Sequence, residues 1–513
     1  MLALAPEEGQ VDSRLVALVR KELVRPDAPT LPADDAYRFR HLLIRDAAYE
    51  SLPKANRATL HERFASWLEE YGADLVELDE IVGYHLEQAA LYRRELGEPD
   101  PVLGARAAER LAAAAERAWR RHDAGAAASL GERAVALFEH DDERRLALLS
   151  TLALALNGVG RMSESLELLT EARDAVDAVI SARARFLKAT IAPVAVGEGF
   201  DASLAEVRAA IDELEPIGDP GVLAEAHVGL AQVLFWTGRV TEQQAAAERA
   251  RAYAREAGDL NQEAWAVGML ATAAKWGQTP WEEVERLARA MLADAKRLGP
   301  RVELGALDLV AMFAEAQGRF QEAREGVRRN QERLSELGME VLRLSGAMDL
   351  GHVEQLAGEL EAAEQVLREG WVGLGELGEH GYRSTVGAQL GWTLGEQGRL
   401  DEAAHILDEA EALASSDDFV TAMWVLMARA GIASRRGEHE DAVALANEAV
   451  AVIEAMEYAT LHIESRIGLG QALIRADRAA EARAPLTEAL ERAEAKGSLV
   501  LADWARKLLA ETD

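Results

Sequence analysis

Cysteine is absent from the 513-residue sequence, and this absence removes several kinds of chemistry at once. Without thiols the chain cannot form disulfides, use a thiolate nucleophile, or hold iron–sulfur clusters or cysteine-ligated zinc. The pair His61-Glu62 is not followed by a second histidine four residues after the first, so the zinc-protease pattern H-E-x-x-H is incomplete. We therefore expect no metal and no cofactor in this chain.

Basic residues are scarce, and long apolar runs are missing. Lys and Arg number 56 against 89 Asp and Glu, and the formal charge of −33 disfavours nucleic acid or an anionic membrane as a partner. No stretch approaches ~18 uncharged apolar residues, and the first residues carry no basic region followed by an apolar one. We expect a cytoplasmic protein that binds no nucleic acid and no membrane.

What the sequence does contain is a repeat of about 40 residues. A Gly-Arg or Gly-Glu turn marks six clear copies, at Gly160, Gly238, Gly318, Gly358, Gly398 and Gly437. Four weaker copies start at His122, Gly199, Gly277 and Asp477. Successive turns are 38 to 41 residues apart, which is too regular for chance.

Small residues recur at fixed distances from these turns. Seven residues before the turn, nine of ten positions hold Ala or Gly, and Leu270 is the exception. The nine are Ala115, Ala153, Ala192, Ala231, Ala311, Gly351, Gly391, Ala430 and Gly470. Small side chains let two antiparallel helices approach closely, and glycine suits a left-handed cap at the turn. Each repeat is therefore predicted to be a helical hairpin.

These offsets resemble the tetratricopeptide repeat, whose small residues fall at the same places around the same turn. Two features differ: the period is near 40 rather than about 34 residues, and the proline that usually closes each repeat is absent. Longer helices account for both. The resemblance implies an all-α fold, a tetratricopeptide-like α-α superhelical solenoid of about ten repeats over residues 102–513. An α/α-barrel glycosidase is disfavoured because acidic residues are spread over every repeat.

The first hundred residues do not follow the repeat. Residues 14–25 have the apolar spacing of a short helix, residues 26–36 form a loop rich in Pro and Asp, and residues 37–52 begin extended and become helical. This order suggests a partial winged-helix region over residues 1–72, followed by a helical linker over residues 73–101.

The run YRFRHLLIRDAAYESLPK, residues 37–54, closely resembles a segment of bacterial STAND-type signalling ATPases, particularly those linked to class III adenylate or guanylate cyclases. In that family the segment joins the ATPase to the repeats, and the order is cyclase, P-loop ATPase, winged helix, then repeats. Residues 57–69 and 78–89 continue the resemblance. The sequence contains no G-x-x-x-x-G-K-[ST] motif and no recognisable cyclase carboxylates, so we expect no enzymatic activity from this chain.

The expected function is that of a protein-interaction and signal-sensing arm. Its superhelix would bind a protein or peptide on the concave face, and a P-loop ATPase or cyclase module would be present in cis or in trans. Two alternatives stay open. One is a stand-alone tetratricopeptide adaptor, and the other is the truncated C-terminal part of an ATP-binding adenylate or guanylate cyclase or of a transcriptional regulator. The last repeat runs to the end without a helix-turn-helix, which favours the cyclase-linked branch.

The resemblance also suggests a role for His41. In STAND ATPases a winged-helix histidine at the start of the helix after a strand reaches the nucleotide bound on the ATPase, and His41 matches that place. Arg38 and Arg40 lie beside it and complete a candidate nucleotide-sensing group. The alternative is a structural histidine at the end of a strand. Acidic residues such as Asp34 and Asp35 are interleaved with the basic ones, which favours an intramolecular interface over DNA.

Tryptophans near the turns are candidates for ligand binding on the concave face. We predict that Trp236, Trp276 and Trp392, with Arg239 and Arg319, contact a peptide, a small effector or a protein partner. The alternative is that these tryptophans only fill core space. The eleven histidines are scattered, which indicates surface or capping roles for most of them.

Overall fold

The computed structural model describes residue 4 and residues 10–27, 36–73, 75–121, 123–196 and 199–512. Its contacts divide the chain into two compact units, Met1–Ala155 and Leu156–Asp513, and each is described by itself. Most of the loop expected at residues 26–36, including Asp34 and Asp35, lies outside the described residues. The turn residue His122 lies outside them too. The division at residues 72 and 101 stays a prediction.

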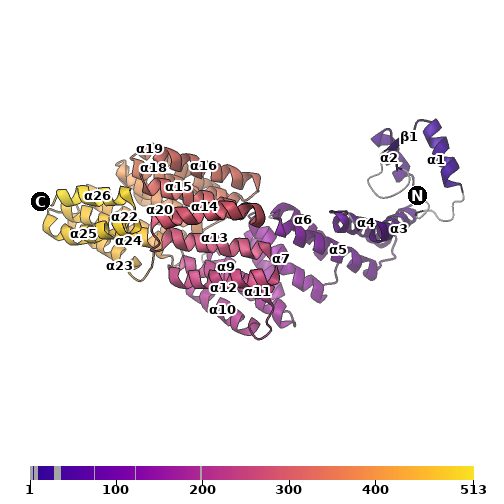
Figure 1. Cartoon of the computed structure of the whole chain (residues 1–513), viewed down its shortest axis with the longest axis horizontal. Helices are drawn as coiled ribbons and strands as arrows, with labels where there is room; N and C mark the ends of the chain where they lie inside the picture. Colours follow the sequence, from indigo (N-terminus) through magenta and orange to yellow (C-terminus); the bar gives the residue numbers. More distant parts are fainter. Residues whose placement is uncertain are drawn as a thin grey trace. The chain divides into compact units, whose positions relative to one another are not determined.

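The first unit begins with two helices and a small sheet (Figure 1). These elements are α1 (Val11–Arg20), β1 (Val24–Asp27), β2 (Ala36–Phe39) and α2 (Leu42–Glu50). The strands are antiparallel, with Val24 opposite Phe39. The helix expected over residues 14–25 is wrong at its C-terminal end. It stops at Arg20 because Glu22 adopts a left-handed backbone, φ 57°, and the chain turns back into β1.

The rest of the first unit is helical. Its helices are α3 (Lys54–Tyr71), α4 (Leu78–Glu95), α5 (Pro101–Arg120), α6 (Ala124–Val135) and the beginning of α7 (Glu143–Gly158). Buried Leu68, Leu86 and Leu103 join α3, α4 and α5 in one apolar core. The start of α5 is well defined by its sequence. Pro101 occupies the first turn, and the side chain of the N-cap residue Asp100 accepts a hydrogen bond from the Leu103 amide at 3.0 Å.

From α5 to α25 the described chain runs through ten consecutive helix pairs, which confirms the predicted all-α, tetratricopeptide-like fold. We call the first helix of each pair A and the second B. The later A helices are α9 (Ala178–Val196), α11 (Pro220–Trp236), α13 (Leu260–Trp276), α15 (Pro300–Ala316), α18 (Ala347–Ala357), α20 (Gly381–Glu396), α22 (Phe419–Arg436) and α24 (Ala459–Arg475). The later B helices are α8 (Met162–Ala172), α10 (Phe200–Leu214), α12 (Val240–Ala257), α14 (Trp281–Leu298), α16 (Phe320–Glu336), α19 (Leu360–Glu376), α21 (Leu400–Leu413), α23 (His439–Ile453) and α25 (Ala479–Lys496). The short α17 (Glu340–Ser345) precedes α18, and α26 (Leu499–Ala510) follows the last pair.

The turns between A and B follow the predicted chemistry in the clear copies. Gly160, Gly238, Gly318, Gly358, Gly398 and Gly437 all have φ between 68° and 84°, the left-handed region that glycine enters without strain. Two weaker copies differ, since Gly199 has φ −67° and Gly277 has φ −78°. In another weak copy Asp477 takes the left-handed conformation, φ 59°, without being glycine.

The small residues seven positions before the turn pack where the pattern predicts. A Cβ atom added to Gly391 would lie 2.5 Å from the Leu407 side chain on the B helix of the same pair, and one added to Gly470 would lie 2.5 Å from Leu486. Gly351 has the same relation to Leu367, at 2.7 Å. The A and B helices therefore approach so closely that no larger residue fits without a shift.

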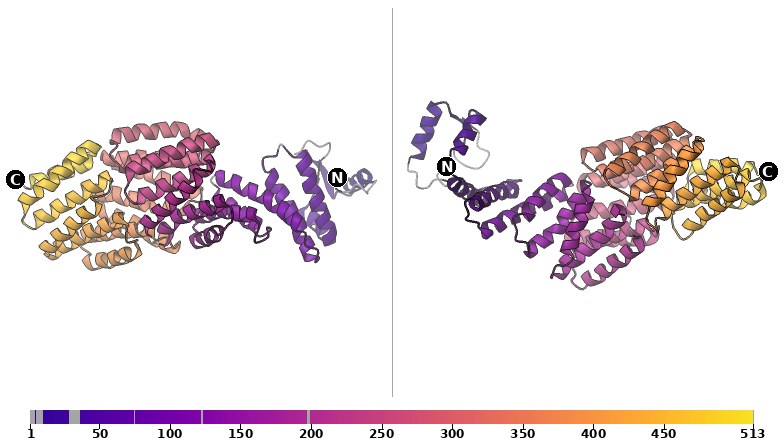
Figure 2. Two further views of the ribbon diagram at one scale, coloured as in Figure 1. Left: turned by 90° about the horizontal axis from the view of Figure 1, so that it is seen from below. Right: turned by 180° about the vertical axis from the view of Figure 1, so that it is seen from behind.

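The second unit coils until residues about two hundred positions apart touch, an arrangement that Figure 2 shows from two further sides. The amide of Asp201 donates to Asp417 Oδ2 at 3.0 Å, and the amide of Thr241 donates to Glu457 Oε2 at 2.5 Å. Lys496 Nζ donates to the backbone oxygens of Gly277 and Thr279 at 2.6 and 2.7 Å. In each contact the region of an A-to-B turn meets the region of a later B-to-A connection. We call this row of contacts the seam.

Candidate functional site

The A helices from α11 to α24 enclose an interior space of about 110 Å³, which we call the inner chamber. Its lining extends from Phe235 on α11 to Glu464 on α24, so that seven successive A helices contribute to it. The aromatic members are Phe235, Trp236, Trp276, Trp281, Tyr382, Trp424 and Tyr458. The charged members are Lys275, Glu315, Asp349, His352 and Glu464. An aromatic wall with a few charged groups is typical of a ligand site.

The aromatic rings meet mostly edge to face across the chamber. Trp236 lies 5.2 Å from Tyr382 between ring centroids, and Trp276 lies 5.8 Å from Tyr458. The His352 ring meets Trp424 at 6.2 Å with an interplanar angle of 81°. These pairs connect helices that are far apart in the sequence, and they hold the wall in one arrangement.

His352 forms the centre of a buried charge cluster. Its Nδ1 donates to Glu315 Oε1 at 3.1 Å and its Nε2 donates to Glu464 Oε1 at 2.8 Å. Burial alone would lower the pKa of His352, but the two carboxylates outweigh it and raise the pKa well above its ordinary value. The imidazole is therefore the doubly protonated, cationic form, with one carboxylate on each ring nitrogen.

Lys275 forms a second cluster beside the first. Its Nζ lies 3.0 Å from Asp349 and 3.2 Å from Asp308, and 5.2 Å from the centroid of the Trp276 ring. Burial would lower the pKa of Lys275, but the two aspartates outweigh it and the pKa is raised. Burial also raises the pKa of Asp308 to about 6, against the opposing effect of Lys275. Lys275 is thus a fixed cation held against an aromatic ring.

Two carbonyl-type acceptors at the chamber, and the hydroxyl of Tyr458, have no hydrogen-bond partner among the described residues. One is Glu315 Oε2, on a side chain whose other oxygen holds His352. The other is Oε1 of Gln389 on α20. A buried oxygen without a donor costs free energy, so both atoms mark places where a donor fits.

The structure brings together only part of the predicted concave-face site. Trp236 and Trp276 both line the inner chamber, together with Trp281 and Trp424, which sequence reasoning did not select. Trp392 instead packs, partly buried, against the apolar core of the second unit. Arg239 and Arg319 lie at A-to-B turns, where they pair with Glu242 and Glu322 three residues on. Ligand binding by these five residues stays a prediction.

The predicted nucleotide-sensing group lies on the N-terminal sheet and helix. His41 follows β2 and is the N-cap residue of α2; it is exposed, and its side chain makes no capping hydrogen bond. Arg38 lies 2.5 Å from Asp27, and Arg40 lies 3.9 Å from Glu22. The side chains of Arg38 and Arg40 are 66% and 45% exposed. The strand-to-helix position expected for His41 is therefore present.

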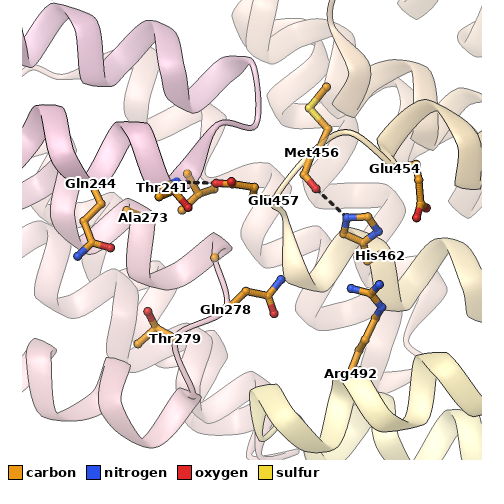
Figure 3. Close-up of a pocket in the computed structure, with 12 residues that line it drawn as sticks. Thr241, Gln244, Ala273, Gln278, Thr279, Glu454, Met456, Glu457, His462 and Arg492 are labelled. Carbon is orange, nitrogen blue, oxygen red and sulfur yellow. Dashed lines mark hydrogen bonds between the residues drawn. The ribbon is translucent and has the colours of Figure 1, made fainter.

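A cleft of about 410 Å³ lies at the seam, where α12, α13 and the turn after α13 face the connection between α23 and α24, α24 itself and α25 (Figure 3). Its lining is mainly polar and includes Gln244, Gln278, Glu454, Glu457 and Arg492. Figure 3 shows the hydrogen bond from the Thr241 amide to Glu457 across the cleft and the one from His462 Nε2 to the Met456 carbonyl, 2.8 Å.

Sequence reasoning missed the histidines of this region. His227 and His462 are buried and His352 is nearly so, so these three are exceptions to the surface or capping role expected for most histidines. The burial of His352 follows from the coiling of the second unit, because His352 contacts residues 37 and 112 positions away. A histidine on the apolar stripe of an A helix, beside Leu350 and Val353, was the available signal.

No three His, Asp or Glu side chains in the described ranges are placed to share a metal ion. None of the helices within those ranges combines the length and the apolar character that a membrane span needs.

No family model matches the sequence, and no curated protein sequence matches it. Several solved structures of helical repeats are similar. A STAND protein with a tetratricopeptide repeat sensor from Pyrococcus horikoshii is 14% identical with a TM-score of 0.45, over 80% of this chain and 59% of its own. Cut9, in the Cut9–Hcn1 complex of APC/C, is 14% identical with a TM-score of 0.49, over 92% of this chain and 95% of its own. A Rap protein complexed with Competence and Sporulation Factor is 13% identical with a TM-score of 0.39, over 79% of this chain and 99% of its own.

This chain therefore spans less than two thirds of the archaeal STAND protein. At these identities and TM-scores the similarities carry no argument about function. The fold rests instead on the helix pairs described above.

Proposed function

We propose that this chain is the non-catalytic sensor and interaction arm of a cyclase-linked STAND ATPase. The observation that supports this function is the inner chamber, whose lining comes from seven A helices between Phe235 and Glu464. An effector in the chamber contacts both ends of one superhelical turn, so its binding changes the stability of the closed coil. Sensing by such an arm needs no chemistry of its own.

Signal transfer in this proposal is differential binding. The effector or a protein partner favours one arrangement of the repeats, and the N-terminal region transmits that preference to a P-loop ATPase or cyclase module in cis or in trans. His41, with Arg38 and Arg40, would contact the nucleotide on that module. The exposure of all three side chains supports this role, because none of them is occupied within the apolar core. A cytoplasmic location and the absence of nucleic-acid partners stay predictions.

The experiment uses the chain assembled with its ATPase module, and it follows nucleotide exchange. If His41 stabilises the closed, ADP-bound state, His41→Ala weakens that state by about 1–3 kcal/mol, the range of a hydrogen bond to a charged group, and ADP leaves faster. The matched control is His439→Ala, an exposed histidine at the start of α23. The isolated chain is expected neither to bind ATP tightly nor to hydrolyse it.

Melting temperatures of both variants test for misfolding. If nucleotide exchange is equally fast in wild type and His41→Ala and the melting temperature is unchanged, His41 has only a structural role. That result would favour the stand-alone adaptor.

A further inference from the structure

The inner chamber has an excess of negative charge. Four carboxylates belong to its two clusters, three of them on the chamber lining and Asp308 outside it, and only two cationic side chains balance them. The carboxylates are those of Asp308, Glu315, Asp349 and Glu464, and the cations are Lys275 and His352. Each cation is shared between two carboxylates, so neither cluster is neutralised from within.

Two buried acceptors point to a missing donor. Glu315 is 7% exposed and Gln389 is 6% exposed, and both line the chamber. Within the described residues, Glu315 Oε2 and Gln389 Oε1 accept no hydrogen bond. Oxygens of a carboxylate and an amide are both acceptors, so the group that satisfies them must carry N–H or O–H donors. A positive charge on that group also offsets the excess of carboxylates.

The chamber walls limit the size and the character of the molecule that supplies the hydrogen-bond donor. Trp236, Trp281 and Trp424 present apolar and aromatic surface to the chamber, and such rings attract a cation at their faces. The space of about 110 Å³ is slightly smaller than an apolar cavity of about 150 Å³ that holds benzene. The occupant is therefore a small group with an apolar body.

We propose that the inner chamber binds an organic cation that presents an ammonium or guanidinium group on a short apolar body. The inference rests on the proposed function, since it names the chemical class of effector that the sensor arm recognises. The cationic group donates to Glu315 Oε2 and Gln389 Oε1, and its apolar body packs against the tryptophans. A free amine and the side chain of Lys or Arg in a peptide share this chemistry.

Calorimetric titration of the full chain tests the ligand class. The probes are n-butylamine and agmatine, with n-butanol as a neutral molecule of the same size as butylamine. We expect both amines to bind at least tenfold more tightly than n-butanol and to change the fluorescence of the tryptophans at the chamber. A peptide arm compares acetyl-Gly-Arg-Gly-amide with the same peptide carrying citrulline. Tighter binding of the arginine peptide than of agmatine identifies a peptide side chain as the source, and the reverse identifies a free amine.

Two variants locate the binding. Glu315→Gln removes one negative charge at nearly constant shape and is expected to weaken amine binding at least tenfold. Glu303→Gln, on the same helix, is the control and leaves binding unchanged. Gln389→Leu removes the second acceptor and serves if Glu315→Gln fails to fold.

Equal affinities for n-butylamine and n-butanol would overturn the proposal, and so would amine binding that neither chamber variant weakens. If the amines fail while nucleotide exchange on the assembly still depends on His41, the ligand class is wrong and the proposed function stands.

Discussion

His227 shows how burial changes the chemistry of one residue. It lies on α11, is 2% exposed and stacks on Tyr253 with ring centroids 5.6 Å apart. Burial, with a smaller contribution from Arg249, lowers the pKa of His227 from 6.5 to about 4. The folded protein therefore keeps this imidazole neutral over a pH range in which the unfolded chain takes up a proton.

The sign of the pH effect follows from that difference. Between pH 6.5 and pH 4 the unfolded state binds more protons at His227 than the folded state, so the free energy of unfolding falls as the pH falls. From pH 7 to pH 5 the loss from this residue is about 2 kcal/mol. His227→Phe keeps the stack on Tyr253 and removes the titration.

Thermal melting at pH 7 and pH 5 measures the difference. The melting temperature of His227→Phe is expected to fall less than that of wild type over this interval. Parallel losses in the two proteins would show that His227 is protonated when folded.

At the residue scale, the sequence predicted only those chamber residues that lie next to a recognisable turn. Trp236 and Trp276 stand at the ends of A helices just before recognisable turns, and both line the chamber. Glu315 and Glu464 carried no local signal. The place of His352 on an apolar stripe indicated burial but not its partners, because the contacts of these residues join three different A helices. The charge cluster of the site therefore could not be predicted without the coiled arrangement of the second unit.

At the scale of helices, the A–B contact has almost no spare volume. Gly391→Leu or Gly470→Leu drives a side chain into Leu407 or Leu486 in a fully buried position, and we expect a loss of about 1–3 kcal/mol in the free energy of unfolding. Glu448→Leu, on the exposed face of α23, is the control and should cost little. Urea titration compares the midpoints. Coincident midpoints for the glycine variants and the control would contradict the register of the pairs.

The helix pairs were predictable because each depends on residues within one repeat. The period placed the turns, and the small residues placed the A–B contact. Other features depend on more distant residues. α1 ends early because Glu22 turns the chain into β1, which pairs with β2, and no pattern in residues 14–25 carries that information. Boundaries set by a distant partner are poorly encoded in local sequence.

At the scale of the whole molecule, the seam contacts hold the coil of the second unit closed. Lys496 is 1% exposed and donates to the backbone oxygens of Ala274, Gly277 and Thr279. Lys496→Met keeps the apolar stem and leaves these carbonyls without their donor. We expect a loss of about 1–3 kcal/mol and faster amide hydrogen exchange over residues 274–281.

Lys507→Met on α26 is the matched control, since Lys507 is exposed and forms an ion pair with Asp503 on its own helix. Hydrogen exchange followed by mass spectrometry measures both variants. Equal exchange over residues 274–281 in both would show that the seam closes without Lys496.

The seam also limits how such a chain can change its length. Both backbone-to-carboxylate contacts of the seam join residues 216 positions apart, which is between five and six repeats of about 40 residues. A repeat added at either end of the array leaves the spacing between the existing seam partners unchanged. A repeat duplicated between residues 280 and 410 would instead lengthen the chain between seam partners. Each earlier turn would then face the B-to-A connection that lies one repeat before its present partner. Thr241 would then meet Asp417 and keep a carboxylate, whereas Gly277 would meet Met456, which has no donor to replace Lys496. Duplication inside the coil therefore carries a penalty that duplication at its ends avoids.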